Sequence, residues 1–442
     1  MSETPGQYEH ARHRILILGA GFGGLAVARE LDKRLNGMNV SILMVDRDNS
    51  LLFSPLLWTV ADGRSGVNDI VVPIRALQRR QGFHVLQAAV LGIDLEGREV
   101  TTTAGIRPYD TLIVALGSIT AIPDLPGLRE HARVFHAPVD AIELRNRLID
   151  AIEAAHNAQD PEERREWLTF VVSGAGDTGI ELAAVIHDYL VSGLFKQYPW
   201  LADERPRVVL VGHAPRVVPM DAPETSASVQ RVLEDEGIEV RTGVTVEAAT
   251  ERRVHTSAGE IAARTIFWAA GITAPDIVRQ LPVQHAHNGA VIVDGDLRLP
   301  DHPEVYAVGD CAWAFDGVTH APIPPTAQAA QHMGIYVGRA VAARLGPKQP
   351  PPFRFRPLGH LALLGTRTGV ARIGPLILTG LPAWLLWHSY YLWRIPGMRN
   401  RIQLLLDWLI SGLFGRETSE LRLDKHGVRA ARDLQSHPAG AT

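Results

Sequence analysis

Two glycine-rich segments, each set between an apolar run and a helical pattern, restrict the fold of this chain more than any other feature. The first, HRILILGAGFGGLAVAREL, places Gly19, Gly21 and Gly24 in the spacing GxGxxG directly after the apolar residues 15–18. In such a turn the glycines permit a tight bend, a close approach of the backbone to a pyrophosphate, and close helix packing. The helix that follows offers free N–H groups and a positive dipole end to phosphates. The segment therefore predicts a dinucleotide site.

The segment that follows the first helix supports this prediction. NVSILMVD reads as a second apolar strand and ends at Asp46. A carboxylate at that point can accept hydrogen bonds from the hydroxyls of an adenosine ribose. A GxGxxG spacing alone is weak, but strand, glycine turn, helix, strand and acid in this order are a specific signal.

The same pattern returns in the middle of the chain. WLTFVVSGAGDTGIELAAVI combines a strand, the glycines Gly174, Gly176 and Gly179, and a helix, and RVVLVGHAPRVVP is the next strand. Two such units in one chain predict two bound dinucleotides. The alternative is that the second unit is a repeat that binds nothing.

Three further strands fit a flavin. YDTLIVALGS and RTIFWAAGI each end in small residues, late in each nucleotide unit, where the chain can pass close to a cofactor or to the other domain. HPEVYAVGDCAW ends in Gly309 and Asp310, and a carboxylate at that strand end can accept a bond from a ribityl hydroxyl. Taken alone, Gly-Asp is a common turn.

Length and cysteine usage narrow the classes of protein. A chain of 442 residues is expected to form two or three domains. Its single cysteine, Cys311, excludes an internal disulfide or a redox-active cysteine pair, and we expect it to be a small buried hydrophobe. The start of the chain lacks the pattern of a signal peptide, so we expect a cytoplasmic protein.

Charge is distributed unevenly along the chain. Residues 317–406 contain ten Lys or Arg and no Asp or Glu, although the whole chain has a net charge of −4. Such a stretch suggests a surface that faces an anionic partner, either nucleic acid or anionic lipid. No nucleic-acid-reading motif is present, so we expect no nucleic acid partner.

The same stretch holds four of the nine tryptophans, in GLPAWLLWHSYYLWRIPGMRNRIQLLLDW at residues 380–408. From Arg401 onward, a helix would place Gln403, Asp407 and Ser411 on a narrow polar stripe among apolar residues. That helix is too short to span a bilayer. Aromatic and basic residues beside an apolar face predict helices that lie in the plane of an anionic membrane. Core packing and a dimer interface remain as alternatives.

The order of these motifs resembles type II NADH dehydrogenases, single-subunit NADH:quinone oxidoreductases, over roughly residues 12–424. GAGFGG, ALGS, GAGDTGIELA, WAAGI and VYAVGD carry the resemblance, together with LLFSPLLWTVADG, PPTAQAAQ and the aromatic tail. The resemblance implies that the first unit holds FAD, through Gly19, Gly21, Phe22, Gly23, Gly24, Asp46, Ala115, Gly117, Gly309 and Asp310. It implies that the second holds NAD(P)H, through Gly174, Gly176, Thr178, Gly179, Gly212, His213, Arg216, Ala270 and Gly271.

Glu181 lies two residues after the third glycine of the second unit, near the start of its helix. We expect the helix dipole to favour its ionised form. The resemblance implies a role in proton handling where nicotinamide, flavin and quinone meet. The alternative is an exposed residue that only supports the helix start.

The segment IPPTAQAAQHMGIYVGRAV begins with two prolines and a threonine, which predict a helix start. The family has a second glutamine four residues after the first, whereas here Gln331 and His332 lie three and four residues after Gln328. An amide or imidazole on this face could hydrogen-bond a quinone carbonyl. Which of the two makes the contact stays open.

Nucleotide choice depends on the end of the second unit's second strand. Family members commonly have Glu there, but this chain has Gly212, followed by His213 and Arg216. The missing carboxylate removes repulsion against a 2′-phosphate, which the two cationic groups could attract. We expect NADH as the main substrate, with unusual tolerance of NADPH.

Together these features predict an α/β flavoprotein with two Rossmann-like domains, the first split around the second, and a C-terminal membrane-binding helical segment. We expect NAD(P)H oxidation through FAD with reduction of a membrane quinone, without a metal site, at the cytoplasmic side of the cell membrane. A soluble-acceptor reductase and a non-catalytic nucleotide sensor are the alternatives, and a homodimer is plausible. The expected parts are the FAD domain (12–125 and 285–346), the NAD(P)H domain (126–284), the membrane-associated domain (347–427) and a disordered tail (428–442).

Overall fold

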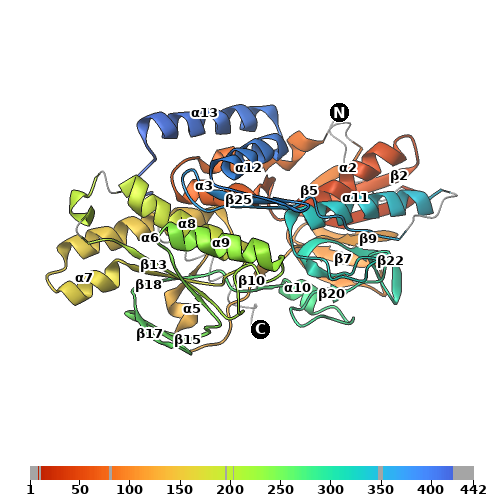
Figure 1. The fold of residues 1–442 in the computed structure, drawn as a ribbon. Coiled ribbons are helices and arrows are strands. Elements are labelled where there is room, and N and C mark those ends of the chain that lie inside the picture. The colour runs from red at the N-terminus through yellow and green to blue at the C-terminus, as the bar shows by residue number, and fades with distance from the viewer. Residues whose placement is uncertain are drawn as a thin grey trace.

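A computed structural model describes residues 8, 11–78, 82–194, 197–202, 204–346 and 352–421. The tail expected at 428–442 lies outside the described residues. Two sheets of mainly parallel strands, each with its own helices, lie side by side, and the C-terminal helices cover one side of the molecule (Figure 1). The fold confirms the α/β prediction.

The first sheet has the strand order β21-β22-β9-β1-β2-β5. β1 pairs in parallel with β2 on one side and with β9 on the other, and β22 joins the sheet beside β9 although it lies far along the chain. The central strands are apolar on both faces because helices and loops cover both. The bounds are β1 His13–Leu18, α2 Phe22–Leu35, β2 Val40–Asp46, β5 His84–Gln87, β9 Thr111–Val114, β21 Arg298–Leu299 and β22 His302–Ala307.

The second sheet, β11-β18-β12-β13-β14, repeats this plan within residues 132–268. All its neighbouring strands are parallel. The bounds are β11 Ala132–Val134, α6 Pro138–Asn157, α7 Pro161–Trp167, β12 Thr169–Ser173, α8 Asp177–Asp188, β13 Arg207–Gly212, α9 Pro223–Asp235, β14 Glu239–Thr242 and β18 Thr265–Trp268.

The two chain segments that connect the sheets pair with each other. β10 (Ile119–Thr120) pairs antiparallel with β19 (Ile272–Thr273), and the indole Nε1 of Trp268 donates a 2.7 Å hydrogen bond to the carbonyl of Ala121. The two crossings are therefore linked by backbone and side-chain bonds, which fixes how the two nucleotide units face each other.

Helix α11 (Ala327–Arg344) packs directly on α2. Gly334 and Gly338 allow this approach, since a Cβ at Gly334 would lie 2.3 Å from the carbonyl oxygen of Gly23, and one at Gly338 would lie 2.7 Å from Cβ of Glu30. The hydroxyl of Thr326 caps the helix by accepting a 3.1 Å bond from Ala329 N–H. This confirms the predicted helix start and places it beside the first glycine loop.

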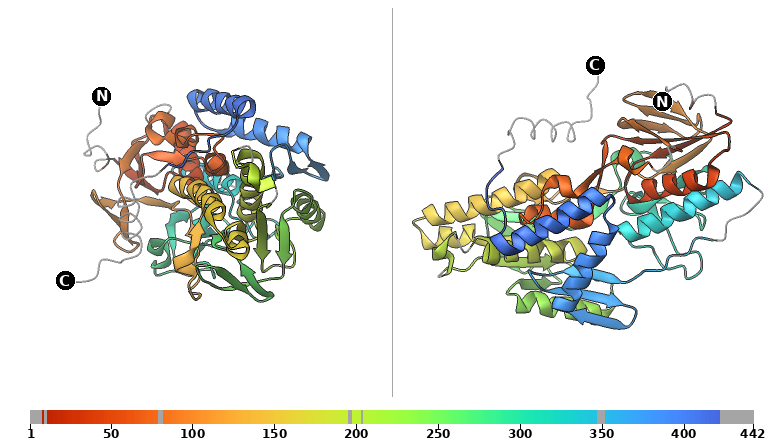
Figure 2. Two further views of the ribbon diagram at one scale, coloured as in Figure 1. Left: turned by 90° about the vertical axis from the view of Figure 1, so that its left-hand side faces the viewer. Right: turned by 90° about the horizontal axis from the view of Figure 1, so that it is seen from above.

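The C-terminal part is a three-stranded antiparallel sheet followed by two helices. Its elements are β24 (His360–Leu363), β25 (Gly369–Ile373), β26 (Leu376–Thr379), α12 (Leu381–Arg394) and α13 (Met398–Phe414). The views in Figure 2 agree that α12 and α13 lie at the outside of the molecule. Within the described residues no helix combines the length and apolarity needed to cross a bilayer.

Helix α12 exposes fewer of its aromatic side chains than its sequence suggested. Trp387 is buried, with its ring 5.1 Å from that of Trp58 in α3 (Leu57–Ala61), and Trp384 packs against the same core. Of the α12 tryptophans, Trp393 alone is strongly exposed, at 67%. One side of α12 therefore fills a core, as the core-packing alternative expected, while Leu381, Leu385 and Trp393 remain exposed on the helix.

Helix α13 has its polar stripe turned inward and its apolar residues turned outward. Leu404 is buried, and Asp407 faces the body of the protein beside Asp69 of α4 (Val67–Ile70). Leu413 and Phe414 are 78% and 83% exposed. The other exposed apolar residues of this face are Met398, Ile402, Leu405, Leu406, Leu409 and Ile410. Such a contiguous apolar patch on a surface indicates a membrane or another protein.

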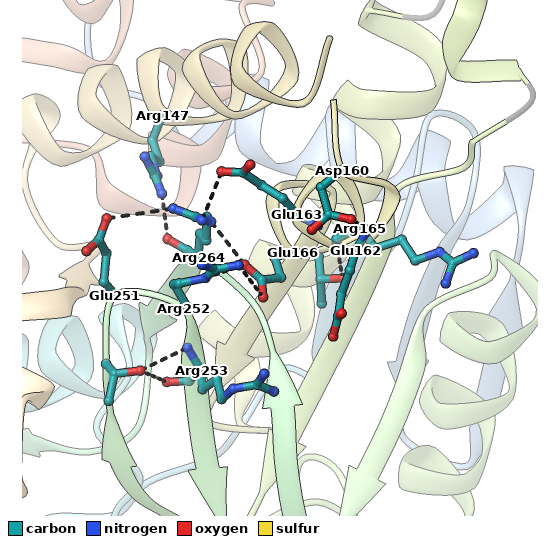
Figure 3. A network of polar contacts seen from close by, with 12 residues as sticks. Arg147, Asp160, Glu162, Glu163, Arg165, Glu166, Glu251, Arg252, Arg253 and Arg264 are labelled. Carbon is teal, nitrogen blue, oxygen red and sulfur yellow. Dashed lines mark hydrogen bonds and ion pairs between the residues drawn. The ribbon is translucent and has the colours of Figure 1, made fainter. Parts of the chain in front are cut away.

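A cluster of ion pairs at the far side of the second unit holds α7 to the strands behind it (Figure 3). Glu166 is buried and pairs with Arg252 at 2.8 Å and with Arg264 at 3.2 Å. Arg264 also reaches Glu163 at 3.1 Å, and its carbonyl accepts a bond from Arg147. The charges satisfy one another, which marks this cluster as structural.

Candidate dinucleotide and quinone sites

The first glycine loop is shaped to receive a phosphate group. A Cβ at Gly19, whose φ is +99°, would lie 2.3 Å from the carbonyl oxygen of Ala115, and one at Gly24 would lie 2.0 Å from that of Gly19. A Cβ at Gly21 would meet nothing within 4 Å. Two glycines thus permit backbone packing, while the middle one leaves open space at the start of α2. The residues present fit a dinucleotide pyrophosphate.

The second loop has the same construction. A Cβ at Gly174 would lie 2.5 Å from the carbonyl of Ala269, and one at Gly179 would lie 1.6 Å from the oxygen of Gly174. Again the middle glycine, Gly176, has nothing within 4 Å. The start of α8 is therefore open to a second dinucleotide in the same way.

Backbone bonds show which residues of the two units correspond. Gly19 N–H donates to Val45, and Gly174 N–H donates to Val211. The residues that follow, Asp46 and Gly212, therefore occupy equivalent strand ends.

The carboxylate of Asp46 accepts bonds from the N–H groups of Ala20 (2.6 Å) and Asp48 (2.9 Å), which fixes it beside the loop. Burial raises its pKa. At Gly212 a Cβ would lie 2.5 Å from Cβ of Ala175, so this strand end has no room for an acid. Of the two nearby residues expected to attract a phosphate, His213 is exposed, while Arg216 donates to the carbonyl of Pro219 at 2.7 Å.

The residues expected at the ribityl chain come together. Asp310 accepts a 2.8 Å bond from the hydroxyl of Ser118, and burial raises the pKa of Asp310. Gly117 and Gly309 both adopt positive φ, at 68° and 75°. Cys311, the next residue, is fully buried and its thiol pKa is raised by burial to about 11, which confirms the expectation of an inert small hydrophobe.

Glu181 lies under the C-terminal sheet rather than at an open helix start. Its Oε1 accepts a 3.2 Å bond from the N–H of Leu363 in β24. Burial raises its pKa to about 8, with a smaller contribution from Asp177. The prediction of an ionised Glu181 is wrong, because desolvation by β24 and α12 outweighs the helix dipole. A carboxyl group with this pKa can take up and release a proton near neutral pH.

The three candidate residues of α11 differ in their contacts. Gln328 has a buried side-chain Nε2 without a hydrogen-bond partner among the described residues. Gln331 accepts a bond from the guanidinium of Arg394, at the end of α12. His332 packs edge-on against Phe355, and burial followed by the charge of Arg394 lowers its pKa. The orphaned amide of Gln328 can donate to a ligand oxygen, and an uncharged His332 can accept a proton.

Several residues that shape these sites were not identified from the sequence. Ala269, rather than Ala270, covers the second loop, as Ala115 covers the first. Both alanines lie two residues before a glycine, so the pattern Ala-x-Gly in the two segments would have identified Ala269. Arg394 and His360 reach the site from the C-terminal part. No local pattern signals these two, since their neighbours are distant in the chain.

His360 belongs to a group of three residues whose spacing would suit a metal ion, with Asp177 and Asp221. Its Nε2 lies 2.8 Å from Asp177, and its Nδ1 lies 3.5 Å from Asp221. The two nitrogens of one ring thus face two different carboxylates. This is the geometry of an ion triad around an imidazolium rather than of ligands that converge on one point.

Comparison with known proteins agrees with this geometry. The family model for pyridine nucleotide-disulphide oxidoreductases matches residues 13–334, and that for the NDH2 C-terminal domain matches residues 358–417. The type II NADH:quinone oxidoreductase Ndh of Mycobacterium tuberculosis is 33% identical over 92% of this chain and 89% of its own. NdhA of the same organism is 32% identical over 95% and 91%. The structure of NDH2 from Plasmodium falciparum in complex with NADH superposes with a TM-score of 0.82, at 19% identity, over 92% of this chain and 100% of that chain, and shows the shared fold.

Proposed function

The chain belongs to the pyridine nucleotide-disulphide oxidoreductases and, within them, to the type II NADH:quinone oxidoreductases, and on this basis we propose that it oxidises NADH and reduces a membrane quinone. The observation that carries the proposal is the pair of glycine loops, each with an open middle glycine, in a molecule whose last helix turns its apolar face outward. A soluble-acceptor reductase needs the first feature but not the second.

Bound FAD would supply the redox chemistry by accepting a hydride from NADH and passing two electrons to the quinone. We assign FAD to the first unit, where the loop after β1, Asp46 and Asp310 would hold it. We assign NADH to the second unit, at the start of α8. The division into residues 12–125 with 285–346, and 126–284, follows the strands of the two sheets.

Reduction of a quinone consumes protons as well as electrons, and two groups of this chain are suited to handle them. Glu181 has a pKa of about 8, so it holds a proton at neutral pH and can release it to a neighbouring base. Gln328 has a free buried amide that can donate to a quinone oxygen. We propose that Gln331, which is tied to Arg394, orients this end of α11 and that His332 stands behind it.

The outward face of α13 is the proposed contact with the membrane. Its exposed leucines, isoleucines and Phe414 would lie among lipid tails, and the acid-free stretch would favour anionic headgroups. We propose a peripheral enzyme at the cytoplasmic side of the cell membrane. A second copy of the chain covering α13 is the alternative occupant.

The experiment that tests the function is steady-state turnover of the purified protein with NADH and a short-chain quinone, in detergent and in vesicles. We expect a stoichiometrically bound flavin that NADH reduces rapidly, followed by reoxidation by quinone. Reoxidation by a ferredoxin-like acceptor but not by any quinone would contradict the proposal. A flavin that NADH does not reduce would instead support a nucleotide sensor.

A further inference from the structure

A cavity of about 440 Å³ lies beneath α13, between that helix, α6 and the loop that joins α3 to α4. Its volume is within the range of small-molecule sites. Part of its wall is apolar and includes Val60 and Ile142. Ile410 also lines the cavity, and its side chain is 54% exposed on the apolar face of α13. The cavity therefore adjoins the proposed membrane surface.

Three arginines line this cavity, and two of them are paired. Arg64 lies 2.6 Å from Asp188, and Arg416 lies 2.6 Å from the same carboxylate. Both also approach Asp62, at 3.1 and 3.5 Å. The two positive charges are therefore balanced by two buried negative ones.

The third arginine, Arg145 of α6, has no such balance. It is only 4% exposed, yet among the described residues it makes no hydrogen bond and no ion pair, and its Nε is buried without a partner. Glu417, an acid that acts on its charge and also lines the cavity, is exposed and accepts a hydrogen bond from the N–H of Ser419. Burying an unpaired guanidinium is costly unless a negative group compensates it.

Another donor of the cavity wall is also unsatisfied. The hydroxyl of Ser65 is buried without a hydrogen-bond partner among the described residues, while Nη1 of Arg416 has only the 3.5 Å ion pair with Asp62. The remaining carboxyl group of the wall, Asp407, has a raised pKa caused by burial and by Asp69, so it adds less negative charge than an ordinary aspartate. A buried guanidinium and a hydroxyl without acceptors in one cavity suit a ligand with anionic oxygens.

We propose that this cavity binds the phosphate of an anionic phospholipid, with Arg145 and Ser65 as donors and with the acyl chains along Ile410 and the outer face of α13. The site would turn a general attraction to anionic membranes into recognition of a single headgroup. The proposed phosphate site rests on the proposed docking of α13 to the membrane. The experiment distinguishes failure of the site from failure of the docking. A free phosphate ester offers the same oxygens, so the test also distinguishes these two sources.

The experiment measures binding of the FAD-loaded protein to vesicles of phosphatidylcholine alone and of phosphatidylcholine with a quarter phosphatidylglycerol. The main variant is Arg145→Met, which keeps the length of the side chain and removes its charge. We expect the preference for the anionic vesicles to fall about tenfold, with binding to neutral vesicles unchanged. Ser65→Ala should reduce the preference less.

The matched control is Arg399→Gln, which removes an exposed arginine from α13 outside the cavity. Its effect should be small and should disappear at high salt, because exposed charges are screened. The effect of Arg145→Met should persist, since the contact is buried. Thermal stability without lipid gives a second readout: Arg145→Met should be as stable as the parent or more stable, because it removes an unpaired buried charge.

Inorganic phosphate and glycerol 3-phosphate distinguish a lipid headgroup from a free phosphate ester as the ligand. If only the anionic vesicles stabilise the parent protein, a headgroup with its chains is required. If the soluble phosphates stabilise it too and Arg145→Met abolishes this, the oxyanion chemistry is supported and the lipid source is overturned. If Arg145→Met retains the full preference for anionic vesicles, the site does not exist. The same conclusion follows if Arg145→Met does not fold and Ser65→Ala retains the full preference. Failure of the parent protein to bind either vesicle would overturn membrane docking itself.

Discussion

Nε2 of His360 lies 2.8 Å from Oδ1 of Asp177, so an ion pair joins the first strand of the C-terminal sheet to the first residue of α8. That residue stands at the helix end proposed for the NADH pyrophosphate. The negative charge of Asp177 at that helix end repels the phosphates, and a protonated His360 neutralises this charge.

Replacing His360 by alanine should therefore weaken NAD⁺ binding by about three- to tenfold at pH 7. Isothermal titration of the FAD-loaded protein measures this directly. Asp177→Asn should bind NAD⁺ at least as well as the parent, and adding it to His360→Ala should restore affinity. His255→Ala, which removes a surface pair with Glu260 at 3.1 Å, serves as the control.

The same pair predicts how binding depends on pH. Burial opposes the charge of His360, but the hydrogen bond and charge of Asp177 and the charge of Asp221 raise its pKa above the ordinary value. The contribution of the imidazolium is therefore complete at acid pH and is lost as pH rises through that raised pKa. NAD⁺ affinity of the parent should decline over this range, whereas the double variant His360→Ala/Asp177→Asn should show a flat profile.

Glu181→Gln tests the buried carboxyl group. We expect normal flavin content and a turnover about 10- to 100-fold lower, since the amide cannot exchange a proton. Stability should change in a defined direction. A pKa raised to about 8 in the folded state means that stability is lost as pH rises from the ordinary Glu range through 8. The variant should therefore melt higher than the parent at pH 9, and parental kinetics at every pH would exclude a proton-handling role.

How far the sequence predicted these sites depends on how local each feature is. Gly19, Gly21 and Gly24 and their repeat are recognised within a few residues, because their spacing belongs to a single turn between a strand and a helix. The sequence also placed Gly212 at the end of the second unit's second strand, and backbone bonds show that this position is equivalent to Asp46.

The protonation of Glu181 could not be predicted in this way. Burial raises the pKa of Glu181, and part of that burial comes from β24, which begins nearly two hundred residues away. The position of Glu181 on its helix alone suggested the opposite charge state. Helix α13 shows a related limit: its periodicity identified a polar stripe and an apolar face, but only packing shows that Asp407 is turned inward. Periodicity gives the two faces of a helix and leaves open which one meets the protein.

Nucleotide choice gives the fourth prediction. An acid cannot be restored at Gly212 itself, because its Cβ would lie 2.5 Å from that of Ala175. His213→Glu places the carboxylate on the next, exposed residue instead. It should depress kcat/KM for NADPH about tenfold or more, with a much smaller effect on NADH, because like charges repel the 2′-phosphate. A parent protein that already rejects NADPH by several orders of magnitude would show that the strand end does not relax specificity.

The last prediction concerns the docking of α13 on the body. Asp407 faces Asp69, whose Oδ2 already accepts a bond from the N–H of Gly66. Burial and then this second carboxyl group raise the pKa of Asp407 to about 7. The pair is stable while it shares a proton, so the attachment of α13 should weaken as pH rises from the ordinary Asp range through 7.

Hydrogen exchange measured along α13 at pH 6 and pH 8, corrected for the intrinsic rates, reports this attachment. We expect protection of the parent helix to fall at pH 8 and that of Asp407→Asn to remain, because the amide cannot ionise. Asn400 anchors the start of the helix by donating to the carbonyl oxygens of Asp69 and Val71, at 2.9 and 3.2 Å. Asn400→Ala should therefore lower protection equally at both pH values. An identical pH response in the parent and in Asp407→Asn would show that the carboxyl pair does not control the helix.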